Sequence, residues 1–162
     1  MIQIPTNNFW KDRIDPNGIK HGIRALVLHI TDGSYESTIN HFQNPNGASA
    51  HYIVREDGET VQMVEEKDAS WHAGKVVNPR WQGYSGSNPN YATIGVEVVS
   101  KGQFPQIRQW LAWARLCKEI ITRNSIQLDS MGIVNHNEIN AGKSCPGGWF
   151  NRLWLLILIK LV

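Results

Sequence analysis

Three stretches of the chain are almost continuously apolar and predict buried strands. They are residues 23–29, 93–99 and 132–136. Aliphatic runs without alternation are typical of strands covered on both faces of a sheet. Two further apolar stretches, residues 50–55 and 60–64, flank an Asp57-Gly58 pair. Because Asp-Gly accommodates the positive φ angles of a tight turn, this segment predicts a β-hairpin.

Helical spacing of apolar residues is found in three other segments. Residues 35–43 follow the sequence Thr31-Asp32-Gly33-Ser34, which offers a helix N-cap. Residues 106–122 predict the longest helix, and a last helix is predicted from about residue 149 to the end. The apolar positions assigned to the longest helix are Ile107, Leu111, Ala114, Cys117 and Ile121.

The order of these elements predicts a single α/β domain over residues 1–162. It has a mixed β-sheet of about five strands, flanked by helices on both faces. Residues 1–22 are predicted to form an irregular N-terminal segment, because Pro5, Pro16 and Gly18 interrupt regular structure. The apolar tail, residues 153–162, predicts a buried closing helix. The alternatives for this tail are an oligomer contact, a membrane-touching segment or the cut edge of a longer chain, so the oligomeric state stays open.

The composition is that of a globular protein and argues against several functional classes. Of the 162 residues, 41% are hydrophobic and 19% charged, with a formal net charge of +2. Because the basic residues are scattered, no nucleic-acid partner is expected. No transmembrane segment is expected, since the apolar tail is shorter than the roughly 20 residues a spanning helix needs. The N-terminus lacks the charged and apolar regions of a signal peptide.

The two cysteines, Cys117 and Cys145, are too few to indicate a disulfide framework. Cys117 lies in a helical pattern and is expected to be a buried structural thiol. Spacing alone does not exclude a disulfide between the two.

Two histidines stand at the ends of apolar strands, and one of these cysteines follows in a loop of small residues. His29 ends the first apolar run, His136 ends the last, and Cys145 lies nine positions after His136. Each alone would more often be structural. Together they can meet at one centre, and two imidazoles with a thiolate suit zinc. Catalytic zinc usually has three protein ligands, with the fourth position open to water or substrate.

Several polar residues have both a catalytic and a structural interpretation. Glu97 lies inside an apolar strand, where a carboxylate is costly unless paired. It is either the partner of a basic residue or a general acid/base with a raised pKa. Lys143, two residues before Cys145, is either a solvated loop residue or a group that stabilises an oxyanion. His51 and His72 are candidates for substrate contact or proton transfer.

Five short motifs, in order along the chain, resemble the successive motifs of the type-2 amidase family. These are zinc-dependent N-acetylmuramoyl-L-alanine amidases, related to phage amidase-type lysozymes and peptidoglycan recognition proteins. The motifs are Leu28-His29-Ile30-Thr31, Ser49-Ala50-His51-Tyr52-Ile53-Val54, Trp71-His72-Ala73-Gly74, Asn90-Tyr91-Ala92-Thr93-Ile94-Gly95-Val96-Glu97 and Lys143-Ser144-Cys145-Pro146-Gly147. The similarity runs from about His21 to Trp149, nearly the whole chain.

The resemblance implies hydrolysis of the amide between N-acetylmuramic acid and L-alanine of bacterial peptidoglycan. It implies a Zn²⁺ cofactor on His29, His136 and Cys145, with Glu97 as acid/base and Lys143 as electrostatic helper. Zinc would activate a water and polarise the scissile carbonyl, while Glu97 carries the proton. One branch of the family has a catalytic tyrosine where this sequence has Ala50, so Glu97 resembles the base of the other branch.

Aromatic and polar residues of the loops are expected to line a groove for glycan and peptide. The residues assigned to this groove are Trp71, His72, Trp81, Tyr84 and Asn90, and those predicted to bind substrate are His51, His72, Trp71 and Asn90. The expected partner is peptidoglycan, reached either as a phage or prophage lysin or as an exported autolysin domain.

Two other interpretations belong to different classes. A non-catalytic peptidoglycan-binding module would be expected to lack zinc ligands, and all three are present here. A cysteine peptidase could use Cys145 with His136 and Glu97. Sensitivity to a chelator would favour zinc, whereas inactivation by a thiol alkylator without metal loss would favour the peptidase.

Overall fold

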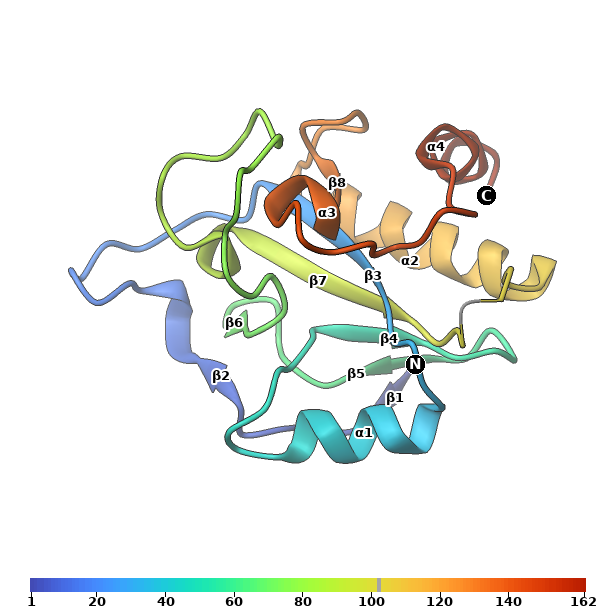
Figure 1. Cartoon of the computed structure of the whole chain (residues 1–162), viewed down its shortest axis with the longest axis horizontal. Coiled ribbons are helices and arrows are strands. Elements are labelled where there is room, and N and C mark those ends of the chain that lie inside the picture. Colours follow the sequence, from blue (N-terminus) through green and yellow to red (C-terminus); the bar gives the residue numbers. More distant parts are fainter. Residues whose placement is uncertain (102) are drawn as a thin grey trace.

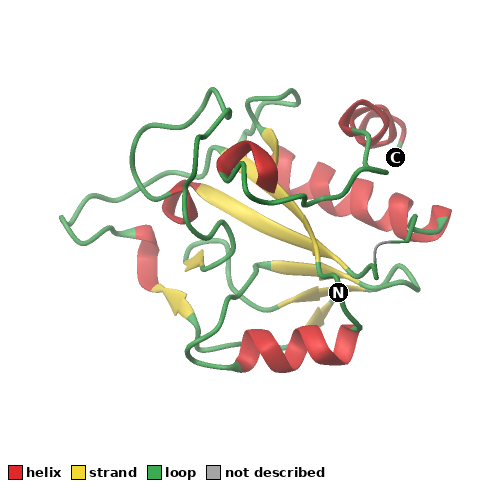
Figure 2. Ribbon diagram, in the orientation of Figure 1, coloured by secondary structure: helices red, strands yellow, loops and turns green. Residues whose placement is uncertain are grey.

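The computed structural model describes residues 1–101 and 103–162, and its centre is a six-stranded mixed sheet (Figure 1; Figure 2). The strand order is β1-β5-β4-β7-β3-β8. The strands are β1 (Ile2–Gln3), β3 (Ala25–Ile30), β4 (Tyr52–Val54), β5 (Thr60–Gln62), β7 (Thr93–Val98) and β8 (Ile133–Asn135). The α/β class and the mixed sheet predicted from the sequence are confirmed, with one strand more than expected.

Strands β4, β7, β3 and β8 run parallel, so their carboxyl ends meet at one edge of the sheet. The predicted hairpin is formed by β4 and β5, which pair antiparallel. Its turn includes Gly58 at φ +86°, as the Asp-Gly pair suggested.

The prediction for residues 1–22 was wrong in part. Strand β1 pairs with β5, and β2 (Phe9–Trp10) pairs with β6 (Ala69–Ser70) in a second, two-stranded sheet. A short 3₁₀ helix, η1 (Lys11–Arg13), follows β2. Strands of two residues carry no periodicity, and their partners lie far along the chain, so sequence pattern cannot find them.

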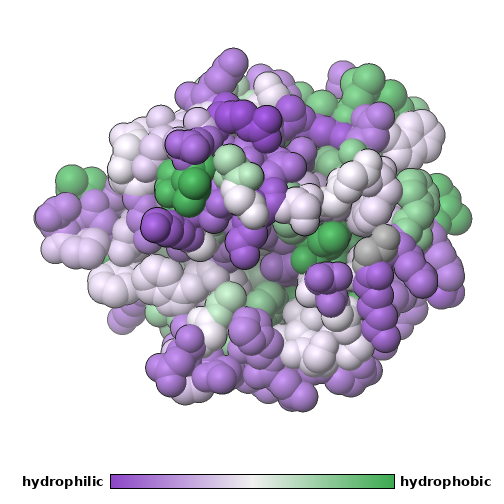
Figure 3. Space-filling model, in the orientation of Figure 1, coloured by the Kyte–Doolittle hydropathy of each residue, from purple (hydrophilic) through white to green (hydrophobic). Residues whose placement is uncertain are grey.

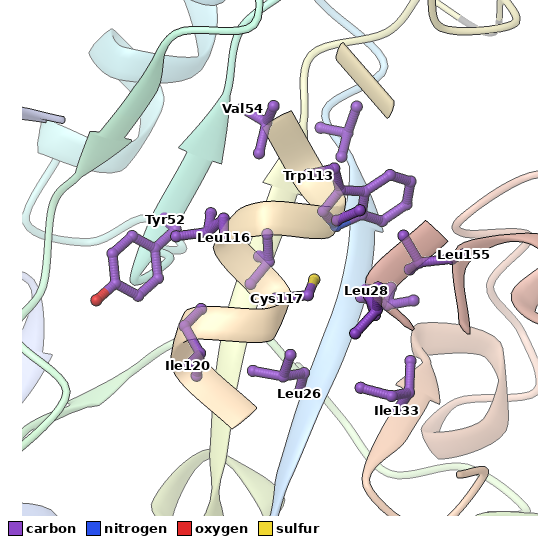
Figure 4. Close-up of a cluster of buried hydrophobic side chains, with 14 of the residues drawn as sticks. Leu26, Leu28, Tyr52, Val54, Trp113, Leu116, Cys117, Ile120, Ile133 and Leu155 are labelled. Atoms are coloured by element: carbon purple, nitrogen blue, oxygen red, sulfur yellow. The ribbon is translucent and has the colours of Figure 1, made fainter. Parts of the chain in front are cut away.

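Helices α2 (Ile107–Asn124) and α4 (Arg152–Leu161) cover one face of the sheet, whereas α1 (Tyr35–Gln43) and the short α3 (His136–Ile139) pack on the other face. Helices α2 and α4 pack on the side to which Leu26, Leu28 and Val96 point. Figure 4 shows Leu28, Trp113 and Cys117 meeting between α2 and the sheet. Helix α1 packs through Phe42 with Ile53 and Val61 on the opposite face. A second 3₁₀ helix is η2 (Pro89–Ala92).

The buried stripe of α2 differs from the predicted one. Ile107 is 63% exposed, and the residues that face the sheet are centred on Trp110, Trp113 and Ile120. The two indoles provide the largest apolar surfaces of the helix, so the helix is rotated to bury them. Cys117 is fully buried, as predicted.

Helix α4 is buried on one side only. Leu155, Leu158 and Ile159 pack against the core that includes α2. Its outer side is apolar and exposed through Leu153, Trp154, Ile157 and Leu161. Figure 3 shows apolar surface at the upper right, where Figure 1 places this helix. Among the described residues, no helix has the combined length and apolar character of a membrane span.

Candidate metal centre and active site

The parallel pairing of β3 and β7 places His29 beside Glu97. The two residues are directly opposite in the register, near the carboxyl ends of their strands. Because side chains alternate across a strand, both point away from α2, to the face that carries Val27 and Gly95. Both line a cavity of about 860 Å³. This edge of a parallel sheet is where α/β proteins commonly bind ligands.

His136 is positioned by a tight passage from β8 into α3. The Glu138 side chain, in the first turn of this short helix, folds back to cap its start. The Glu138 carboxylate accepts the N–H of Asn135 at 2.8 Å and binds the Arg152 guanidinium at 2.6 Å. These contacts of Glu138 hold the backbone next to His136, and so fix the position from which its ring extends.

Cys145 returns to the same place through the loop that follows α3. Its carbonyl accepts the N–H of Asn137 at 3.1 Å, and its Sγ accepts the N–H of Ile30 at 3.1 Å. Cys117 and Cys145 are both free thiols, so they form no disulfide with each other.

The three predicted ligands converge. One donor atom each of His29, His136 and Cys145 lies within 4.8 Å of the other two. The Nδ1 atoms of the two histidines are 3.1 Å apart. On the far side of its ring, His136 Nε2 lies 3.0 Å from the carbonyl oxygen of Ala73. A carbonyl can only accept, so Nε2 carries the proton, and Nδ1 directs a lone pair at the centre.

The electrostatic environment also favours a metal. Burial, followed by the neighbouring imidazoles, holds the pKa of His29 well below its ordinary value, and burial lowers the pKa of His136. Both rings are therefore neutral near pH 7, which is the form that binds a metal. Two neutral imidazoles and one sulfur are a donor set that zinc accepts. The residues present thus fit a zinc ion.

Glu97 is buried without a partner. The residue is 8% exposed, and no hydrogen-bond partner for Oε2 is found within the described part of the chain. Burial raises the pKa of this carboxyl to about 8. The alternative predicted from the sequence, an ion pair with a basic residue, is not observed among the salt bridges of the described residues. A carboxyl with a pKa near neutrality can release and recover a proton during a reaction.

Lys143, Trp71 and His72 also line the cavity. Lys143 is exposed at its rim, and its positive charge contributes to the lowered pKa of both histidine ligands. The sequence did not identify the cavity wall formed by Ser37, Thr38 and His41 of α1. These three residues share one side of the predicted helix, at spacings of one, three and four, which is the signal that could have found them.

The structure places His51 and Asn90 in the interior rather than on the cavity wall. His51 is fully buried, and its Nδ1 accepts the N–H of Gly95 at 3.0 Å. The side-chain oxygen of Asn90 accepts the N–H groups of His72 and Ala73. Direct contact with a substrate, the role predicted for His51 and Asn90, does not follow from these positions. Trp81 is likewise buried, with its Nε1–H donated to the carbonyl of Met131.

A mixed α/β sheet with a His–His–Cys donor set, a buried carboxyl and an open cavity defines a candidate metal-dependent hydrolase. Comparison with known proteins identifies the family. The model of the N-acetylmuramoyl-L-alanine amidase family, the type-2 amidases, matches residues 19–148. The chain therefore belongs to this family, as its motifs suggested.

Individual relatives agree with this assignment. N-acetylmuramoyl-L-alanine amidase A of Achromobacter lyticus is 36% identical over 113 residues, which are 65% of this chain and 55% of that protein. The chain thus spans little more than half the length of this curated relative. AmpDh3 of Pseudomonas aeruginosa, solved with an anhydromuramic pentapeptide, superimposes with a TM-score of 0.69 at 27% identity, covering 90% of this chain and 65% of that chain.

AmiD of E. coli shows the same fold. It was solved with the substrate anhydro-N-acetylmuramic acid-L-Ala-D-gamma-Glu-L-Lys. The TM-score is 0.75 at 24% identity, with 93% of this chain and 65% of that chain covered.

Proposed function

We propose that this protein is a zinc-dependent N-acetylmuramoyl-L-alanine amidase of bacterial peptidoglycan. It cleaves the amide that joins N-acetylmuramic acid to the L-alanine of the stem peptide. The observation that carries the proposal is the meeting of His29, His136 and Cys145 next to the unpaired carboxyl of Glu97, at the wall of an open cavity. Family membership and the muramyl-peptide complexes of AmiD and AmpDh3 support the choice of substrate.

His29, His136 and Cys145 would hold the zinc ion, which supplies Lewis acidity toward a carbonyl oxygen and lowers the pKa of a water. Glu97 takes the proton of the attacking water and delivers it to the leaving nitrogen. Its raised pKa suits both transfers, because neither protonation state is strongly favoured near neutral pH. The Lys143 ammonium, at the rim of the same cavity, stabilises negative charge that develops on the carbonyl oxygen.

The cavity has walls that suit a muramyl peptide. Trp71 offers an aromatic face, which suits the apolar side of a sugar ring. Thr38 and His41 of α1 also line the cavity and provide polar atoms for a peptide. Because the substrate is wall material, the protein acts at the cell wall, as a phage or prophage lysin or as an exported autolysin domain.

The structure favours zinc hydrolysis over the cysteine-peptidase alternative. Burial raises the pKa of the Cys145 thiol to about 12. A catalytic cysteine needs the opposite shift, because the thiolate is the nucleophile. The non-catalytic binding module is disfavoured because the complete donor set and Glu97 lie together at the cavity.

Metal analysis coupled to a muropeptide cleavage assay tests the proposal. The purified protein is expected to contain about one zinc ion per chain, to lose cleavage with a chelator and to recover it when zinc is restored. Cys145→Ser should lower zinc occupancy after dialysis. Cys117→Ala is the matched control, because it removes the other thiol from the apolar core and should leave zinc in place.

Two results would contradict the proposal. Unchanged cleavage after complete removal of metal would exclude zinc catalysis. Inactivation by a thiol alkylator at constant zinc content would instead support the cysteine peptidase.

A further inference from the structure

Two consecutive residues lie behind both histidine ligands, on the side away from the candidate metal centre. His72 Nδ1 is 3.1 Å from Nε2 of His29, and the Ala73 carbonyl oxygen is 3.0 Å from Nε2 of His136. The ring of His72 stands nearly perpendicular to that of His29, at an interplanar angle of 85°. One dipeptide therefore contacts the outer nitrogen of each imidazole.

The direction of the hydrogen bond between His72 and His29 follows from a chain that begins at Pro89. The Thr93 hydroxyl donates to the carbonyl of Pro89 at 2.8 Å. Its oxygen, 3.1 Å from His72 Nε2, must then accept, so Nε2 of His72 carries the proton. Nδ1 of a neutral His72 is therefore an acceptor, and His29 Nε2–H donates to it. His29 Nδ1 is left with a lone pair that faces the centre.

Both ligand rings are thus fixed in the same tautomer by groups outside the centre. The two Nδ1 lone pairs face each other at 3.1 Å, and neither nitrogen carries a proton in this network. Facing lone pairs repel in a buried site unless a cation lies between them. The network therefore prepares the site for a cation rather than for a hydrogen bond between the rings.

The dipeptide itself is held in place from two directions. The side-chain oxygen of Asn90 accepts both of its amide protons, from His72 at 3.2 Å and from Ala73 at 2.8 Å. The His72 side chain lies directly against the backbone of Gly95, where an added Cβ would come within 2.4 Å of the His72 Cγ. Glycine at this strand position is what lets the ring pack so close to the sheet.

We propose that the His72–Ala73 dipeptide is the outer coordination shell of the zinc site, with His72 as a positioning residue that fixes the proton of His29. This inference rests on the proposed zinc function. His72 lines the cavity, but both of its ring nitrogens are engaged, one by His29 and one by Thr93. It therefore acts on the reaction through His29 rather than through a hydrogen bond to substrate. Asn90 acts one step further out, by holding the dipeptide.

Zinc affinity, measured by competition with a chromophoric chelator, tests this role without relying on turnover. His72→Leu removes the acceptor and should weaken zinc binding roughly 10- to 100-fold. His72→Asn keeps a side-chain oxygen close to the position of Nδ1 and should recover most of the loss. Thr93→Val preserves shape but leaves His72 Nε2–H unpaired, which favours the wrong tautomer, so it should also weaken binding.

Thr6→Val is the matched control for Thr93→Val. Thr6 is also a buried threonine whose hydroxyl donates to a backbone carbonyl, that of Phe42, and within the described residues its side chain forms no hydrogen bond with a histidine. The zinc affinity of the Thr6→Val variant should equal that of the parent protein. The visible absorption spectrum of the cobalt-substituted proteins gives a second readout, because reorientation of His29 changes the geometry of the ligands.

The outcomes separate this inference from the proposed function. If the parent protein binds no zinc, the proposed function itself fails. If the parent binds zinc and Thr93→Val matches Thr6→Val in affinity and spectrum, only the role of His72 is overturned. The same conclusion follows if His72→Asn, still folded by its thermal unfolding curve, binds zinc as weakly as His72→Leu.

Discussion

The two faces of the sheet are made by alternate residues of the same strands, yet their chemistry is opposite. Toward α2, Leu28 and Val96 are fully buried among apolar side chains. One position further along each strand, His29 and Glu97 line the cavity on the other face. Because side chains alternate across a strand, the same six residues of β3 or β7 contribute both to the core and to the site.

The buried side chains of the two faces are stabilised in different ways, by apolar packing on one face and by hydrogen bonds on the other. Apolar contact has no direction, so the α2 face depends mainly on volume and shape. Within the described residues, the indole nitrogens of Trp110 and Trp113 lie in this face without a hydrogen-bond partner. On the cavity face, His29 and His72 each require directed hydrogen bonds, and each has them. Glu97 is the exception, since its Oε2 has no partner within the described residues. Unlike the unpaired indole nitrogens of the α2 face, this oxygen belongs to a carboxyl that lines the cavity and has a raised pKa, which favours a role in chemistry.

The largest effect is expected on turnover, when Glu97 on the cavity face is replaced. Glu97→Gln keeps the shape of the side chain but cannot carry the proton, so turnover of a muropeptide should fall roughly 10²- to 10⁴-fold. Zinc content should not change, because Glu97 is not in the converging donor set. Steady-state cleavage and metal analysis on the same sample measure both quantities.

Val96→Ala is the matched change on the opposite face of the same strand. It should lower the free energy of unfolding and leave turnover of the folded enzyme close to that of the parent. If Glu97→Gln retained parental turnover, Glu97 would have no part in the reaction.

The next largest effect is expected from two neighbouring residues of β3, Leu28 and His29, of which one should affect stability and the other zinc binding. Leu28→Ala should lower the free energy of unfolding of the metal-free protein by about 2–5 kcal/mol, because it leaves a cavity under α2. Its zinc affinity, measured at a temperature where the variant is folded, should match that of the parent. His29→Ala should give the reverse pattern, with zinc binding lost. If folded Leu28→Ala bound zinc as weakly as His29→Ala, the two faces would not be independent.

The sequence predicted the central strands because apolar runs are a local signal. It predicted the convergence of His29 and His136 at the candidate metal centre because both end such runs, and parallel strands bring their carboxyl ends together. The cysteine was found through spacing, since nine positions after His136 suffice for the loop to return. These features follow from short segments read one at a time.

The features that the sequence could not predict depend on distant contacts. Strand β1 has two residues and forms only because β5 offers an edge. His72 and Asn90 were predicted to bind substrate, because polar residues in a loop give no sign of which way they face. The structure shows Asn90 holding the backbone of His72 and Ala73, and the Ala73 carbonyl, which has no side-chain signal at all, holds His136.

The smallest effect is expected in the pH dependence of stability of the metal-free protein. Burial raises the pKa of Glu97 to about 8 in the folded state, whereas in the unfolded chain the carboxyl ionises near its ordinary value of 4.5. Between these values the folded state holds a proton that the unfolded state has released, so stability falls as pH rises through this window. Glu97→Gln removes this contribution and should be more stable than the parent at pH 8. One pKa unit corresponds to about 1.4 kcal/mol, and water in the open cavity reduces the penalty, so we expect a difference of about 1–2 kcal/mol. Urea unfolding from pH 5 to pH 8, with the metal removed, measures it. If the difference in unfolding free energy between Glu97→Gln and the parent stayed constant across that range, Glu97 would have the same pKa in the folded and unfolded states. Burial of this carboxyl on the cavity face would then carry no cost that depends on pH.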